Sequence, residues 1–74
     1  MSADKLVTMA NQISRFFAPM PDRAQAVSGI ADHLRRMWDP RMRRELYALF
    51  DAGGQGMDDI LKQTLTERRE TLKP

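Results

Sequence analysis

The sequence contains no cysteine, and this absence excludes disulfides, thiolate metal sites, iron–sulfur ligation and thiol nucleophiles. A single histidine cannot build a histidine-rich metal site. There is no run of about 18 apolar residues, and the first residues lack the basic-then-apolar pattern of a secretory signal. We therefore expect a cytoplasmic protein that does not cross a membrane and has little equipment for catalysis.

Strand signals are also almost absent, because no alternating run of β-branched residues and no hairpin turn occurs. Apolar residues instead recur at helical spacing along nearly the whole chain. The 74 residues allow one small domain. Domains of this size usually depend on a crosslink, such as a disulfide or a bound metal, or on a partner for stability. The sequence predicts an all-α fold, a small bundle of three to four short amphipathic helices.

Capping signals place the helices. Ser2, Asp22 and Asp39 are suited to N-cap positions, and Gly53 and Gly54 provide a left-handed stop. The chain turns polar at residue 67. We expect residues 1–66 to form a single helical domain and residues 67–74 a polar C-terminal tail. The first predicted helix covers residues 3–18 and the third covers residues 40–52. The second starts after residue 22 and includes Met37 and Trp38 in its apolar stripe. The last helix starts at residue 57 or 58.

Arginine is concentrated in one segment. Five arginines and one aspartate lie between residues 35 and 44, and the remaining charges nearly balance. Cations in the first turn of a helix are disfavoured by the macrodipole, so an arginine-rich helix start points to a functional surface that meets a carboxylate or phosphate. A solvated face is the simpler alternative, and nucleic acid is the generic partner of such a cluster. Against nucleic acid, the cluster is short and the net charge is only +2. The five arginines are Arg35, Arg36, Arg41, Arg43 and Arg44.

Four large apolar residues close the core or anchor a partner, namely Phe16, Phe17, Met20 and Trp38. Adjacent Phe16 and Phe17 lie about 100° apart on a helix, so a helix–helix contact buries one more than the other. Gly29 inside the second helix costs about 1 kcal/mol relative to alanine. One reason for a glycine at position 29 is that another backbone approaches the helix closely there.

Catalytic constellations are missing. His33 has no serine or cysteine that pairs with it in a recognisable motif, so a structural or exposed histidine is the simpler interpretation. The glycines at 53–56 are not followed by the lysine of a phosphate-binding loop, and Asp58 and Asp59 suit a helix start. We expect no enzyme activity of this chain on its own.

Two stretches together resemble a known family. One is Met9-Ala10-Asn11-Gln12-Ile13 followed by Phe16-Phe17, and the other is Trp38-Asp39-Pro40-Arg41-Met42-Arg43, with Gly53-Gly54-Gln55-Gly56 after it. The combination is similar to the delta subunit of soluble, NAD-dependent, molybdenum-containing formate dehydrogenases. The similarity covers residues 5–61 and does not include the last eight residues.

The resemblance implies a non-catalytic accessory subunit that supports assembly or stability of the holoenzyme by docking on a larger subunit. It implies that partner subunits carry the molybdenum cofactor, iron–sulfur clusters and FMN, while this chain binds no cofactor and no metal. The partners expected are the larger formate dehydrogenase subunits, the molybdenum-containing catalytic subunit first among them. The alternative is a small basic helical nucleic-acid-binding or regulatory module. From the resemblance and the charge pattern together, the predicted partner interface comprises Phe16, Phe17, Arg35, Arg36, Trp38, Arg41, Met42, Arg43 and Arg44.

Overall fold

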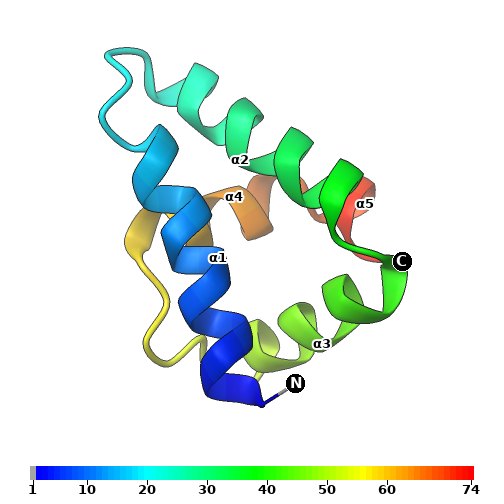
Figure 1. Ribbon diagram of the computed structural model, residues 1–74. Coiled ribbons are helices and arrows are strands. Elements are labelled where there is room, and N and C mark those ends of the chain that lie inside the picture. Colours follow the sequence, from blue (N-terminus) through cyan, green and yellow to red (C-terminus); the bar gives the residue numbers. More distant parts are fainter. Residues whose placement is uncertain (1) are drawn as a thin grey trace.

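Five α-helices make up the fold in the structure, a computed structural model that describes residues 2–74. No strand occurs within these residues, so the all-α prediction is confirmed, with a fifth short helix added to the three or four expected. The helices are α1 Ala3–Phe17, α2 Arg23–Met37, α3 Pro40–Asp51, α4 Asp59–Glu67 and α5 Arg69–Leu72 (Figure 1).

The predicted caps set the starts of the first three helices. The side chains of Ser2, Asp22 and Asp39 each accept a hydrogen bond from a backbone amide in the following turn, at 3.2, 2.9 and 2.9 Å. Gly53 and Gly54 follow α3 with positive φ angles of 129° and 63°, a backbone conformation that stops a helix and favours glycine. Local sequence signals therefore define these boundaries.

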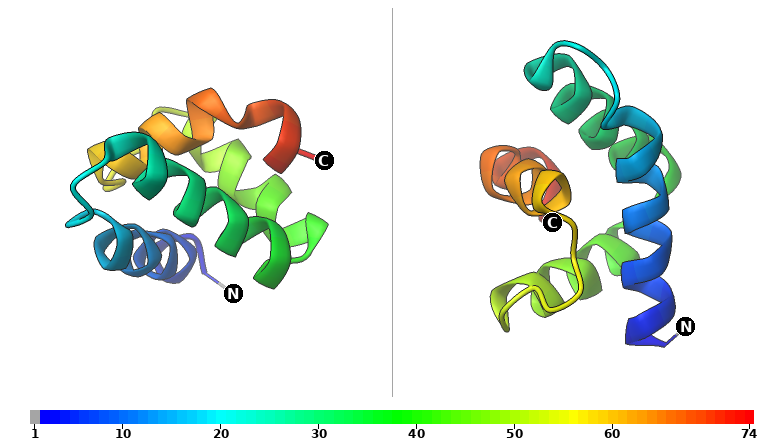
Figure 2. Two further views of the ribbon diagram at one scale, coloured as in Figure 1. Left: turned by 90° about the horizontal axis from the view of Figure 1, so that it is seen from above. Right: turned by 90° about the vertical axis from the view of Figure 1, so that its left-hand side faces the viewer.

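The core forms around α4, which packs against α1, α2 and α3. Seen from the side, α4 and α5 lie between α2 and α3, with α1 alongside (Figure 2). Each helix turns its apolar stripe toward this centre, as burial of apolar area requires. The largest apolar side chains that are fully buried are Leu6, Val27, Ile30, Leu34, Leu46, Tyr47, Leu61, Leu65 and Leu72.

The C-terminal segment differs from the polar tail expected over residues 67–74. It contains α5, and Leu72 is fully buried in the core. Arg69 donates a hydrogen bond of 2.6 Å to the carboxylate of Asp51 and lies over the ring of Tyr47 at 5.1 Å. The hydrogen bond and charge of Arg69 hold the pKa of Asp51 below its usual value. Leu72 follows Leu65 by seven residues, which is a helical spacing, but the five residues from 67 to 71 are all polar. The polar composition of the segment therefore concealed the burial of Leu72.

Candidate docking surface

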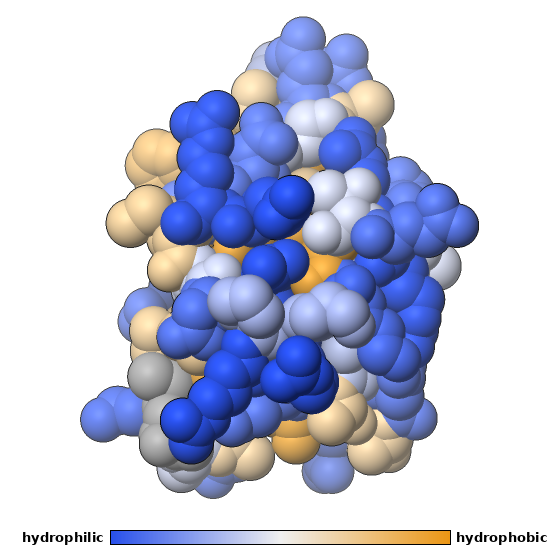
Figure 3. All heavy atoms as spheres, turned by 90° about the vertical axis from the view of Figure 1, so that its right-hand side faces the viewer, coloured by the Kyte–Doolittle hydropathy of each residue, from blue (hydrophilic) through white to orange (hydrophobic). Residues whose placement is uncertain are grey.

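Four of the five clustered arginines are exposed at the junction of α2 and α3, and we call Arg35, Arg36, Arg41 and Arg44 the arginine cluster. The first two lie in the last turn of α2, where the helix dipole favours cations. Arg41 reaches Glu45 at 3.8 Å, an exposed pair of little energetic value. The other three have no carboxylate within 4 Å among residues 2–74. The face that carries this junction and α5 is covered mostly by hydrophilic side chains (Figure 3).

Arg43 requires a correction, because it is only 7% exposed. Its Nε donates to the backbone oxygen of Trp38 at 3.2 Å, and its Nη1 donates to the backbone oxygen of Leu72 at 2.9 Å. The guanidinium therefore joins the end of α2 to the end of α5. Its donors are directed at the protein's own carbonyls, so it is a structural residue and leaves the predicted interface.

Trp38 also requires a correction, because it is the C-cap residue of α2 and is 4% exposed. It belongs to the core cluster, and Met42 is half-buried against that cluster. A side chain that is already desolvated inside the chain has little area left to offer a partner. The apolar anchors must therefore be sought elsewhere.

Phe16 and Phe17 have different environments, as the angle between adjacent helical residues predicts. Phe16 is 78% exposed, whereas the ring of Phe17 lies against Gly29 of α2. The two rings meet edge to face, with centroids 5.1 Å apart. A Cβ at position 29 would overlap the Phe17 ring, so the glycine accommodates an aromatic side chain rather than the backbone that the sequence analysis suggested.

We call the surface around these rings the aromatic face. Met37, which the sequence placed in the buried stripe of α2, is 68% exposed here. Two adjoining hollows of about 320 and 340 Å³ share Phe17 and His33. The first is completed by Gln12, Ile13 and Phe16, and the second by Gly29, Asp32, Arg36 and Met37. The spacing of Gly29, His33 and Met37, four residues apart on one helix, is the sequence signal for this outer stripe.

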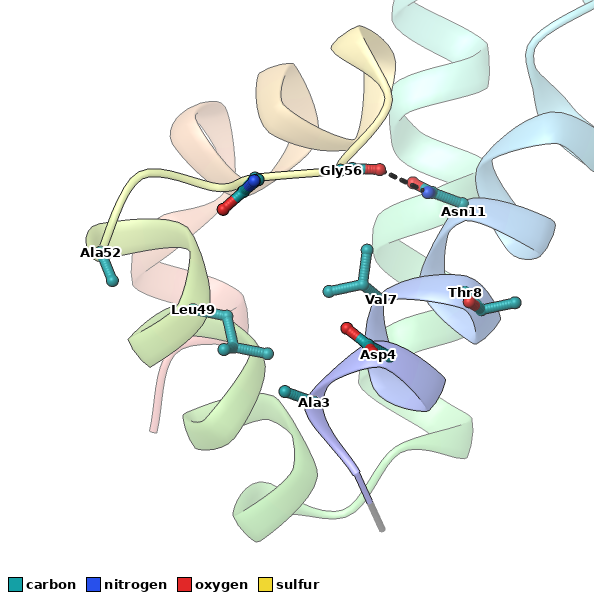
Figure 4. A pocket seen from close by; sticks show the side chains of 9 residues that line it. Ala3, Asp4, Val7, Thr8, Asn11, Leu49, Ala52 and Gly56 are labelled. Atoms are coloured by element: carbon teal, nitrogen blue, oxygen red, sulfur yellow. Dashed lines mark hydrogen bonds between the residues drawn. The ribbon is translucent and has the colours of Figure 1, made fainter.

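Residues 53–56 contain three glycines, and we call this segment the glycine loop. A third hollow, of about 570 Å³, lies between α1, the end of α3 and the glycine loop (Figure 4). Asn11 holds this loop: its Nδ2 donates to the Gly56 oxygen at 2.8 Å, and its Oδ1 accepts from the Asp58 amide at 2.9 Å. Arg15 donates two hydrogen bonds to the Asp58 carboxylate, at 2.8 and 3.1 Å, which raise the pKa of this arginine. Asp58 is thus the N-cap of α4 by position, but its carboxylate is bound by α1. These polar groups are hydrogen-bonded to one another and hold the glycine loop against α1.

The part of the chain that the structure describes contains no candidate cluster of metal ligands and no candidate membrane span. No group of three or more histidine, cysteine, aspartate or glutamate residues among positions 2–74 is arranged to hold a metal ion. None of the helices there has the length and apolar character needed to traverse a bilayer.

Comparison with known protein families identifies a match. The family model described as NADH-dependent formate dehydrogenase delta subunit FdsD matches residues 5–65. No curated protein and no solved structure matches the chain. The matched range contains the arginine cluster and the aromatic face and ends within α4, so α5 lies outside it. The resemblance seen in the two sequence stretches is confirmed.

Proposed function

Because the chain belongs to the NADH-dependent formate dehydrogenase delta subunit family, we propose that it is a non-catalytic subunit that docks on a larger subunit of this enzyme. Docking supports assembly or stability of the holoenzyme. The larger subunit is the molybdenum-containing catalytic subunit, and the molybdenum cofactor, iron–sulfur clusters and FMN belong to the partners. A cytoplasmic location is part of this proposal.

The arginine cluster is the observation that carries the docking role. Four exposed guanidinium groups gather at one helix junction, and only Arg41 has a carboxylate of the described chain nearby. Guanidinium groups bind carboxylates through paired hydrogen bonds, and arginine is enriched at protein interfaces. An acidic surface on a larger subunit is the complementary partner.

The polar groups that the chain buries support a non-catalytic role. Arg43, Tyr47 and Asn11 each donate a hydrogen bond to a backbone oxygen of the same chain. His33 lies on the aromatic face beside apolar rings. A nucleophile and a base in contact are the minimum for covalent catalysis, and these residues do not supply them.

The proposed mechanism is thermodynamic. A subunit that binds only the assembled state of its partners shifts the equilibrium toward that state. At a concentration of about 100 times its dissociation constant, it stabilises the assembled state by about 2.7 kcal/mol. No reactive group is required for this effect.

The test compares cells that produce the larger subunits with and without this chain. We expect its removal to lower the yield of assembled enzyme and the formate-dependent reduction of NAD. A tagged chain purified at moderate salt should retain the larger subunits. Nucleic acid in the eluate without any larger subunit would overturn the proposal.

Charge reversal tests the arginine cluster. Arg41→Glu combined with Arg44→Glu should weaken docking, while the far-ultraviolet circular dichroism of the free chain stays unchanged because both side chains are exposed. Lys5→Glu combined with Lys62→Glu is the matched control, since it changes net charge equally outside the cluster. Equal retention of the larger subunits by both variants would remove the cluster from the docking surface.

A further inference from the structure

The aromatic face presents large apolar side chains to solvent on two neighbouring helices. Phe16 of α1 is 78% exposed and Met37 of α2 is 68% exposed. The ring of Phe17, seated on Gly29, lies between the two adjoining hollows and lines both. Exposed apolar patches on a small domain mark interaction sites, and aromatic anchors beside pockets are typical of interface hot spots.

The hollows run between helices and not along a strand, since residues 2–74 contain no strand whose edge a partner could extend. The recognition mode that fits this shape is a helix laid into an apolar groove, with anchors on successive turns. Gly29, His33 and Met37 extend the face over about two turns of α2, which matches the length of such an anchor pair.

Charged residues at the rim of the groove favour one orientation of a bound segment. Arg36 lines the hollow next to Met37, and no carboxylate of residues 2–74 lies within 4 Å of it. Asp32 lines the same hollow one turn earlier. A carboxylate of an incoming segment is therefore attracted to the Met37 end and repelled from the Asp32 end. Arg35, next to Arg36 in the last turn of α2, adds to the positive charge at that end.

We propose that the aromatic face receives an amphipathic helix of a larger formate dehydrogenase subunit. The helix places apolar side chains against Phe16, Phe17 and Met37 and a carboxylate against Arg36. This inference rests on the proposed function and specifies the chemistry of the partner. A second copy of the chain fits less well, because Asp32 is the one carboxylate lining this face, against four guanidinium groups at the adjacent junction.

The experiment titrates the purified full-length chain onto the larger subunits produced without it. Phe16→Ser should raise the dissociation constant about thirtyfold, the change typical of a hot-spot residue. Arg36→Glu should raise it about tenfold and reduce its dependence on salt. Met20→Ser is the control, because this exposed methionine of the α1–α2 loop lines neither hollow. Because Phe16 and Arg36 are exposed, the helical content of the free variants should equal that of the unmodified chain.

Photo-crosslinking identifies the occupant directly. Replacing Phe16 with benzoylphenylalanine in the assembled enzyme should label a larger-subunit segment with apolar residues at helical spacing and an acidic residue at one end. The same analogue in place of Gln55, in the glycine loop, serves as the control position. Crosslinking between two copies of this chain, or to lipid when vesicles are added, would overturn the proposal.

The outcomes separate the two proposals. Strong binding by the unmodified chain and weak binding by Phe16→Ser supports both. Equal binding by the unmodified chain and by both aromatic-face variants overturns the aromatic face as the docking site and leaves the delta-subunit role intact. Failure of the unmodified chain to bind any larger subunit overturns the proposed function itself.

Discussion

The ring of Phe17 lies against Gly29, and a Cβ at position 29 would overlap that ring. This contact brings α1 against α2 at the one place where α2 has no side chain. Phe16 is the residue before Phe17 on α1, and its side chain points about 100° away. The packing of Phe17 against Gly29 therefore leaves Phe16 exposed. One glycine thus shapes the packing of two helices and the surface beside it.

Gly29→Ala should reduce stability although alanine is the better helix former by about 1 kcal/mol. The added methyl group displaces the Phe17 ring from its seat, and we expect a net loss of about 1 kcal/mol in the free energy of unfolding. In a Phe17→Ala background the same substitution should stabilise the chain, because the steric conflict is gone. Chemical denaturation of the unmodified chain, the two single variants and the double variant measures this reversal. A change in the free energy of unfolding that has the same sign in both backgrounds would contradict it.

Arg43→Met should lower the free energy of unfolding by about 2 kcal/mol, because it removes charged donors from the carbonyls of Trp38 and Leu72. Arg44→Met, at the exposed neighbour, should change it by less than about 0.5 kcal/mol. Trp38 is the only tryptophan, so its fluorescence reports the junction and should shift to longer wavelength in the first variant alone. Equal effects at the two positions would show that Arg43 has no structural role.

Asn11→Ala should loosen the glycine loop, because the Gly56 carbonyl and the Asp58 amide both lose their partner. A cost of about 2 kcal/mol is expected for two part-buried groups left unpaired. Gln12→Ala, at the exposed neighbour, is the control. Hydrogen exchange at the Asp58 amide, measured by NMR, should be faster in the Asn11→Ala variant. Unchanged exchange would show that Asn11 does not hold the glycine loop.

Alkaline pH should destabilise the fold through Tyr47. Burial raises the pKa of this phenol from 10.0 to about 12, although the nearby Arg69 charge lowers it in part. Between these values the unfolded chain releases the phenolic proton while the folded chain keeps it, so the free energy of unfolding falls as the pH rises. Denaturation midpoints across this range measure the slope.

Tyr47→Phe provides the comparison for that titration. The variant should lose about 1 kcal/mol at neutral pH, because the 2.8 Å hydrogen bond to the Leu65 oxygen is gone. Its alkaline slope should be flatter than that of the unmodified chain, since phenylalanine has no proton to release. Parallel slopes would assign the alkaline effect to other groups.

Local sequence signals were sufficient for the secondary structure. Ser2, Asp22 and Asp39 supply acceptors for amides that a helix start leaves unpaired, and Gly53 and Gly54 adopt the positive φ angles that end α3. These interactions span only a few residues, so they can be predicted without knowledge of the fold. The exposed arginines were likewise predictable as a cluster, because all lie within ten residues of sequence.

The roles of individual side chains within that cluster were not predictable in this way. Arg43 and Arg44 are adjacent and chemically identical, yet Arg43 reaches the Leu72 carbonyl from 29 positions away while Arg44 is exposed. Trp38 and Met37 are also adjacent, and the first is buried while the second is exposed. Which member of each pair is buried depends on the direction from which α5 and α4 approach.

The amino-acid order alone therefore determined a helical chain with defined starts and stops, an arginine-rich junction and membership of a delta-subunit family. The tertiary structure decided which side chains are available to a partner, because burial depends on contacts between segments far apart in sequence. Leu72 joins the core from outside the family match, Phe17 seats on Gly29, and Phe16 and Met37 remain exposed beside Arg36.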